Sequence, residues 1–155
     1  MLYDIQSRAN LFVKTSVYDQ ALECLKKNNV LIIIGAPGVG KTITSQMLVL
    51  YYAAQGYRVR YTTDGADLAG LKKALSQSKE TKEVILLDDC FGQAYFSMKE
   101  TQENELLSLI RYVKMNPNKV LIMNSRVTIY REAQERTPAL VSSLDRKEYK
   151  AYVID

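Results

Sequence analysis

Residues 30–42 read VLIIIGAPGVGKT, in which the apolar run Val30 to Ile34 leads into the eight residues Gly35 to Thr42. These eight residues fit the pattern G-x-x-x-x-G-K-[ST], whose glycines let the backbone curl until successive N–H groups point at phosphate oxygens. Apolar residues at helical spacing follow Gly40, so a helix should present its positive end to the same anion. A strand before the pattern and a helix after it are typical of a phosphate-binding loop. The segment therefore predicts a nucleotide-binding domain.

Two side chains of this loop are expected to contact the nucleotide and its metal ion. Lys41 can reach the β- and γ-phosphates, and the hydroxyl of Thr42 is a ligand for Mg²⁺, whose other positions phosphate oxygens and water would fill. The sequence contains no Asn/Thr-Lys-x-Asp motif for reading guanine. ATP or ADP together with Mg²⁺ is therefore the expected ligand.

A second apolar run, Val84 to Leu87, ends in the carboxylates of Asp88 and Asp89. In an open parallel sheet, ligands bind at the carboxyl ends of the strands. We expect Asp88 to hold Mg²⁺, usually through water, and Asp89 to orient or deprotonate a water that attacks the γ-phosphate. A further strand, Arg58 to Thr62, separates the two motifs in the chain. This spacing suggests the P-loop proteins that have a catalytic acid and an inserted central strand.

A third apolar run, Val120 to Met123, ends in Asn124, Ser125 and Arg126. Its polar residues should reach the same edge of the sheet as Asp88. Arg126 could stabilise charge on the transferring phosphoryl group, and Asn124 could fix the attacking water. The alternative is an arginine that is simply solvated at a strand end.

These interpretations give three sets of predicted site residues. The catalytic set is Lys41, Asp89 and Arg126, and the metal ligands are Thr42 and Asp88. The nucleotide-binding set is Gly35, Ala36, Pro37, Gly38, Val39, Gly40, Lys41, Thr42, Ile43 and Asn124.

Short apolar runs that alternate with longer segments of helical period indicate an α/β fold with a parallel sheet. The expected strands are 30–34, 58–62, 84–87, 120–123 and 149–154. Helices are expected between them, and one precedes the first strand. No linker or internal repeat divides the chain, so we predict a single domain over residues 1–155, of which 1–29 form an N-terminal segment and helix.

Composition narrows the class of protein. The chain has 155 residues, of which 47% are hydrophobic and 25% charged, enough to bury a core without disulfides. Two distant cysteines and no histidine provide no zinc pattern. The longest apolar run is too short to cross a bilayer. The net charge of +4 is scattered among acids, so a nucleic-acid partner is not indicated, and a cytoplasmic protein is expected.

The motifs together resemble the STAND class of signalling ATPases among the AAA+ relatives, and particularly the bacterial "novel STAND" NTPases. The likeness covers nearly the whole chain and rests on Phe12-Val13-Lys14 with the following helix, Gly35 to Thr42, Leu87 to Gln93, Asn124-Ser125-Arg126 and the helix containing Ala133. By this resemblance Lys41 and Thr42 match the Walker A positions, Asp88 and Asp89 the Walker B pair, and Arg126 the γ-phosphate sensor. It implies a three-layer α/β/α sandwich whose five-stranded parallel sheet has the order 5-1-4-3-2.

The resemblance also implies a function. Such proteins are usually long switches in which a lid and then sensor or effector regions follow the ATPase module, and this sequence contains only the module. We expect an ATP-binding core, slow at hydrolysis in isolation because a lid is missing, with nucleotide-dependent homo-oligomerisation and a role in bacterial defence.

Two other functions stay open. The alternative is an AAA+ replication initiator or helicase loader that acts on DNA, which salt-dependent DNA binding would distinguish. A small-molecule kinase is less consistent with the sequence, because only Arg111 lies between Asp89 and Asn124 to assist an acceptor.

Overall fold

The computed structural model describes residues 16–35, 41–63, 68–77, 79–90, 100–136 and 150–154 of the chain. In chain order its elements are α2 (Ser16–Asn28), β1 (Val30–Gly35), α3 (Lys41–Ala54), β2 (Arg58–Thr63), α4 (Leu68–Gln77), β3 (Glu83–Asp88), α5 (Glu100–Lys114), β4 (Lys119–Arg126), α6 (Val127–Arg136) and β5 (Lys150–Ile154). Among the described residues no helix is long and apolar enough to cross a membrane.

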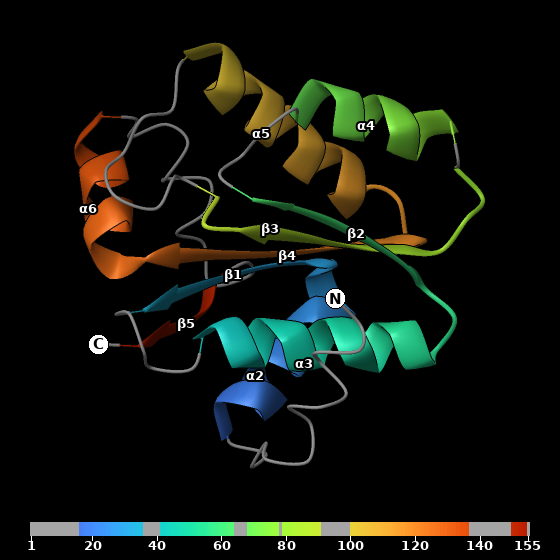
Figure 1. Cartoon of the computed structure of the whole chain (residues 1–155), viewed down its shortest axis with the longest axis horizontal. Helices are drawn as coiled ribbons and strands as arrows, with labels where there is room; N and C mark the ends of the chain where they lie inside the picture. The colour runs from blue at the N-terminus through green and yellow to red at the C-terminus, as the bar shows by residue number, and fades with distance from the viewer. Residues whose placement is uncertain are drawn as a thin grey trace.

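The five strands form one parallel sheet of order β2-β3-β4-β1-β5. This confirms the predicted order 5-1-4-3-2. The chain leaves β1 for the edge strand β2, returns to β3 and β4, and ends at β5 on the other side of β1 (Figure 1). All the strands therefore end at the same edge of the sheet.

Helices cover both faces of the sheet, as the predicted three-layer sandwich requires. α2 and α3 lie on one face, and α4 and α5 lie on the other (Figure 1). Alternate residues of the central strands enter two separate cores: Ile32 and Ile34 pack on the α4–α5 side, whereas Leu31 and Ile33 pack on the α2–α3 side. Because both faces are covered, β1, β3 and β4 are almost continuously buried and their sequences read as apolar runs rather than alternating ones.

Two left-handed residues end the helices that flank β1. Asn29 has φ 65° and follows α2, and Gly56 has φ 91° and follows α3. Gly56 donates its N–H to Ala53 O at 3.1 Å, and Tyr57 donates to Tyr52 O at 3.1 Å, which is a Schellman cap. These turns return the chain directly into β1 and β2.

Candidate functional site

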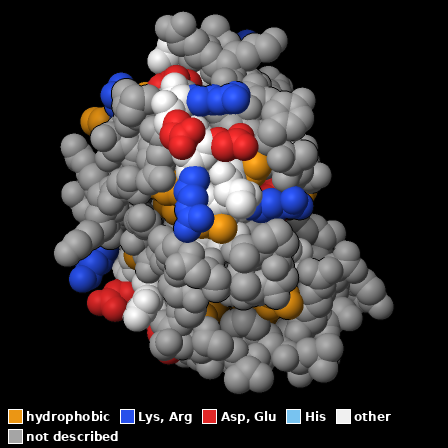
Figure 2. All heavy atoms as spheres, turned by 90° about the vertical axis from the view of Figure 1, so that its left-hand side faces the viewer, with side chains coloured by type: hydrophobic (Ala, Val, Ile, Leu, Met, Phe, Trp, Pro, Cys, Tyr) orange, Lys and Arg blue, Asp and Glu red, His pale blue; other side chains and the backbone are white. Residues whose placement is uncertain are grey.

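The carboxyl ends of β1, β3 and β4 bring the predicted motifs together. Gly35, the last residue of β1, is in register with Arg126, the last residue of β4. Leu87 of β3 is in register with Met123, so that Asp88 and Asn124 are the next residues of adjacent strands. Figure 2 views the molecule from this side, and described acidic and basic side chains lie close together near the middle of the view.

The pleat of the sheet assigns these residues to one face. Leu86 and Ile122 point into the core below α3, and side chains two residues further along a strand lie on the same face. Asp88, Asn124 and Arg126 are thus all on the side of α3. This is the helix whose first residue is Lys41.

Only part of the phosphate-binding loop lies within the described residues. Ala36, Pro37, Gly38, Val39 and Gly40 lie outside them, as does the side chain of Lys41, so the predictions for these residues stay predictions. Thr42 and Ile43 are exposed in the first turn of α3. That turn contains no acidic residue, so the positive end of the helix is not neutralised by its own side chains. This end of α3 is able to receive an anion.

The two carboxylates of the Walker B pair differ in their surroundings. Asp88 is half-buried and accepts a hydrogen bond from the Tyr61 hydroxyl of β2 at 3.3 Å. Asp89 is buried and has φ 48°, a left-handed conformation that only a few non-glycine residue types tolerate. The turn therefore separates a carboxylate that can reach solvent from one that is enclosed.

Asn124 is the residue that holds this turn. Its side chain is fully buried, and its Oδ1 accepts the Asp89 N–H at 2.8 Å while its Nδ2 donates to Ser45 Oγ of α3 at 3.2 Å. Its main-chain oxygen accepts the Cys90 N–H at 3.0 Å. The prediction that Asn124 fixes a water stays a prediction. The structure adds that both ends of its amide already contact protein.

Arg126 and Cys90 complete the site. Arg126 is half-buried at the end of β4 and, within the part of the chain that the structure describes, makes no ion pair. Burial, and then the carboxylates of Asp89 and Asp88, raise the pKa of the Cys90 thiol. Cys90 therefore stays protonated and packs as a small apolar side chain.

Sequence reasoning missed two residues of the site, Ser45 and Tyr61. Ser45 lies three residues after Thr42, so the helical period alone places both on neighbouring positions of α3. Tyr61 meets Asp88 only because β2 pairs with β3 in the observed register. Ser45 could therefore have been found from the sequence, whereas Tyr61 could be found only from the pairing of the strands.

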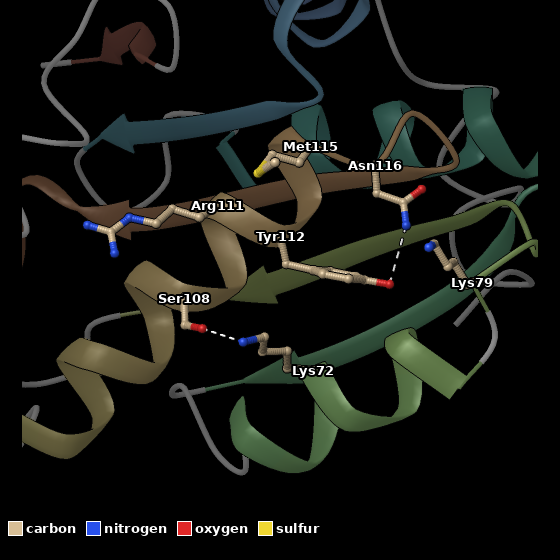
Figure 3. Close-up of a pocket in the computed structure, with 7 residues that line it drawn as sticks. All are labelled: Lys72, Lys79, Ser108, Arg111, Tyr112, Met115 and Asn116. Carbon is tan, nitrogen blue, oxygen red and sulfur yellow. Dashed lines mark hydrogen bonds between the residues drawn. The ribbon is translucent and has the colours of Figure 1, made fainter.

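A pocket of about 400 Å³ lies away from this site, between α4 and α5, and is lined by Lys72, Lys79, Ser108, Arg111, Tyr112, Met115 and Asn116. Figure 3 shows these residues coming from both helices and their C-terminal connections. Lys72 donates to Ser108 Oγ, and Asn116 donates to the Tyr112 hydroxyl at 3.3 Å. Three of the lining residues are cationic and none is acidic.

Comparison with known proteins adds a family and a fold. The family model of the Novel STAND NTPase 3 group matches residues 12–155, nearly the whole chain. No curated protein matches the sequence.

Among solved structures, the chain is similar to AMPPCP-bound DnaA from Aquifex aeolicus, with a TM-score of 0.61 and 23% identity, over 92% of this chain and 48% of that one. It is also similar to the replication initiator DnaA bound to AMPPCP and single-stranded DNA, with a TM-score of 0.63 and 24% identity, over 93% of this chain and 48% of that one. The DnaC helicase loader matches with a TM-score of 0.53 and 20% identity, over 92% of each chain. These likenesses show the P-loop fold, and the chain spans about half the length of the two initiator chains.

Proposed function

This chain belongs to the Novel STAND NTPase 3 family, and we propose that it is the ATP-binding and ATP-hydrolysing core of a signalling switch. Family membership supports a nucleoside triphosphatase in general. ATP as the substrate, a Mg²⁺ requirement, slow turnover in isolation and a switching role in a bacterial cytoplasm are our proposals. So is the organisation of residues 1–155 as one core domain.

The register at the carboxyl ends of the strands is the observation that carries this proposal. Gly35, at the start of the phosphate-binding loop, lies beside Arg126, and Asp88 is on the same face of the sheet as α3. A nucleotide whose phosphates meet the positive end of α3 would therefore have carboxylates and a guanidinium around its terminal phosphate. No other edge of the sheet combines these groups with a phosphate-binding loop.

The residues present fit a Mg²⁺ ion. The exposed hydroxyl of Thr42 and the half-buried carboxylate of Asp88 are hard oxygen ligands on the same side of the sheet. When bound, the ion would neutralise charge on the β- and γ-phosphates. Tyr61 keeps the Asp88 carboxylate oriented through their hydrogen bond.

Protein groups would carry out the remaining steps of hydrolysis. Lys41 binds the β- and γ-phosphates, and Asp89 orients the attacking water and accepts its proton. Arg126 stabilises charge on the transferring phosphoryl group, for which a planar guanidinium is suited. A switch results if the ATP and ADP states favour different arrangements of this core with other copies or other domains.

Calorimetric titration with ATP, ADP and GTP in Mg²⁺ tests the binding step. We expect ATP and ADP to bind more tightly than GTP, and Lys41→Ala to weaken ATP binding by at least about tenfold because it removes a charged phosphate ligand. Lys73→Ala is the matched control, since Lys73 is exposed on α4 away from the strand ends. Equal ATP affinity in Lys41→Ala and wild type would overturn the proposed site.

Phosphate release measured with and without EDTA tests the hydrolytic step. Asp88→Ala should remove the Mg²⁺ dependence together with most of the activity, because it removes the carboxylate that would hold the ion. A size comparison in ATP and in ADP then tests whether nucleotide state sets oligomerisation. Identical oligomers in both would contradict the switch.

The α4–α5 pocket favours a second function, an ATPase that acts on DNA. Lys72, Lys79 and Arg111 offer positive charge without a lining carboxylate, and one similar protein, the replication initiator DnaA, was solved with single-stranded DNA. Anisotropy of a labelled single strand, measured between about 50 and 200 mM salt, tests it. Arg111→Glu should weaken binding and reduce the salt slope by about 1, and Lys27→Glu on α2 is the matched control. Binding that is absent, or equal in both variants, rejects this function.

A further inference from the structure

One buried amide connects three elements of the site. Asn124 of β4 contacts the turn after β3 through Asp89 and the phosphate-binding helix α3 through Ser45, at 2.8 and 3.2 Å. Both Asn124 and Ser45 are fully buried. Asn124 therefore bridges the acid turn and α3.

The chemistry of an amide is specific to this position. Its oxygen accepts the Asp89 N–H while its nitrogen donates to Ser45, and among side chains of this size only asparagine carries an uncharged acceptor and an uncharged donor on two separate atoms. An aspartate would add a second negative charge beside Asp89, and a leucine would leave the Asp89 N–H without its acceptor. A polar side chain that is completely enclosed is therefore retained for its geometry rather than for core packing.

The contacts of Asn124 set the direction of the catalytic acid. The N–H groups of two consecutive residues, Asp89 and Cys90, both donate to Asn124, one to its side chain and one to its main chain. This two-point attachment maintains Asp89 at φ 48°, a conformation that an unsupported aspartate would leave readily. Rotation of the turn would carry the Asp89 carboxylate away from the terminal phosphate.

The attachment to α3 makes the acid sensitive to the nucleotide. Ser45 is one helical turn after Thr42, on the helix whose first turn would contact the phosphates. We propose that Asn124 is a positioning residue that fixes the Asp89 carboxylate relative to α3, so that hydrolysis occurs only when the phosphates hold α3 in place. This inference rests on the proposed function, and it assigns Asn124 a role that acts through Asp89 rather than by contact with the phosphate or water.

Amide hydrogen exchange tests the attachment without any activity. In Ser45→Ala the Asn124 amide loses its link to α3, and in Asn124→Ala the Asp89 N–H loses its acceptor, so exchange at Asp89 should accelerate by about tenfold or more in both variants. Ser125→Ala is the control, because Ser125 is the buried neighbour of Asn124 on the opposite face of β4. Unchanged exchange at Asp89 in Ser45→Ala, which retains the whole Asn124 side chain, would overturn the proposal even if Asn124→Ala does not fold.

Kinetics test the catalytic consequence. We expect kcat to fall by about 10- to 100-fold in Asn124→Ala and by about threefold to tenfold in Ser45→Ala, with the calorimetric ATP affinity unchanged in each. Adding Ser45→Ala to Asp89→Asn should lower the residual rate no further, because both changes act through one carboxylate. Multiplicative effects, or an equal loss of ATP affinity, would show a general structural defect and overturn the positioning role. If the wild type binds no ATP, the proposed function fails first, and the catalytic role of Asn124 fails with it.

Discussion

Charged side chains lie at both ends of the sheet but differ in their surroundings. At the amino ends of the strands, Lys119 and Glu83 are fully buried and form an ion pair of 2.7 Å. At the carboxyl ends, Asp88 and Arg126 are half-buried, and within the described residues neither forms an ion pair. The charges at the amino end are neutralised within the protein, whereas Asp88 and Arg126 at the carboxyl end can still contact a ligand.

The amino end is built from three adjacent strands. Glu83 begins β3 and is in register with Lys119, the first residue of β4. Glu83 Oε1 accepts from Lys119 Nζ, and Oε2 accepts from Arg60 Nε of the edge strand β2. Lys119 donates a further bond to Thr81 O at 2.6 Å. Both carboxylate oxygens of Glu83 and the ammonium group of Lys119 therefore have partners within the protein.

The carboxyl end includes conformations and groups that do not favour stability. Asp89 is left-handed, and the amide of Asn124 is buried to support it. Such features persist where they serve a function and where the rest of the fold provides the stability. The comparison shows that charged side chains are paired within the protein at the start of the strands, whereas our proposal gives those at the carboxyl ends a chemical role.

Breaking the ion pair at the amino end should give the largest effect. Glu83→Gln leaves the buried Lys119 charge without a counter-ion, and we expect the free energy of unfolding to fall by about 3–5 kcal/mol in urea denaturation. Glu80→Gln, at an exposed position nearby, is the control. Glu83→Leu combined with Lys119→Met should recover most of the loss, because an apolar pair replaces an ionic one. A loss of under about 1 kcal/mol in Glu83→Gln would contradict a structural role.

Replacing a carboxylate at the carboxyl end should lower the rate of ATP hydrolysis and leave the stability of the fold unchanged. Asp89→Asn should lower ATP hydrolysis by about 10²- to 10⁴-fold, because an amide cannot accept a proton. Asparagine tolerates the left-handed conformation, so the midpoint of urea unfolding should hardly change. Asp19→Asn on α2 is the control. A strong loss of stability in Asp89→Asn would contradict the proposal that the carboxyl end serves chemistry rather than stability.

Alkaline pH should weaken the amino end in a defined direction. Tyr52 of α3 is buried near this end, and burial, followed by the neighbouring Tyr57, Tyr51 and Tyr18, raises its pKa. The unfolded state loses this proton first, so the contribution of Tyr52 is complete below about pH 10 and is lost above it, by at most about 1.4 kcal/mol per pH unit. In thermal unfolding measured as a function of pH, the wild type should therefore lose stability relative to Tyr52→Phe as the pH rises above 10, because phenylalanine cannot ionise. Parallel curves would exclude this effect.

A single hydroxyl at the carboxyl end should have the smallest effect. Tyr61→Phe removes the exposed hydrogen bond to Asp88, and we expect the Mg²⁺ concentration for half-maximal hydrolysis to rise by about twofold or threefold. Tyr57→Phe, the same change near the amino end, should not alter it. An effect of equal size in both variants would mean that Tyr61 does not orient Asp88.

Much of the fold could be predicted from the sequence because its central strands are continuous apolar runs. The apolar runs of β1, β3 and β4 predicted central parallel strands, and all three are buried on both faces. The expected helices between the strands are present, and one, α2, precedes the first strand. The predicted fifth strand, residues 149–154, is observed as Lys150–Ile154.

Other features could not be read because they depend on neighbours distant in the chain. The ion pair between Glu83 and Lys119 joins residues 36 positions apart, and nothing in either local sequence distinguishes them from solvated strand ends. The hydrogen bond between Tyr61 and Asp88 spans 27 positions and depends on the pairing of β2 with β3. Likewise, the burial of Asn124 follows from α3 lying over β4.

The sequence by itself determined the fold class, the strand order through its resemblance to a family, and the residues that meet at the carboxyl edge. Periodicity and glycine placement act locally, so they can be read along the chain. Only the tertiary structure decided which charges are paired and which stay available, and that Asn124 holds Asp89 to α3. These outcomes depend on register and on the distance between elements, because a hydrogen bond or an ion pair forms only within a few ångströms.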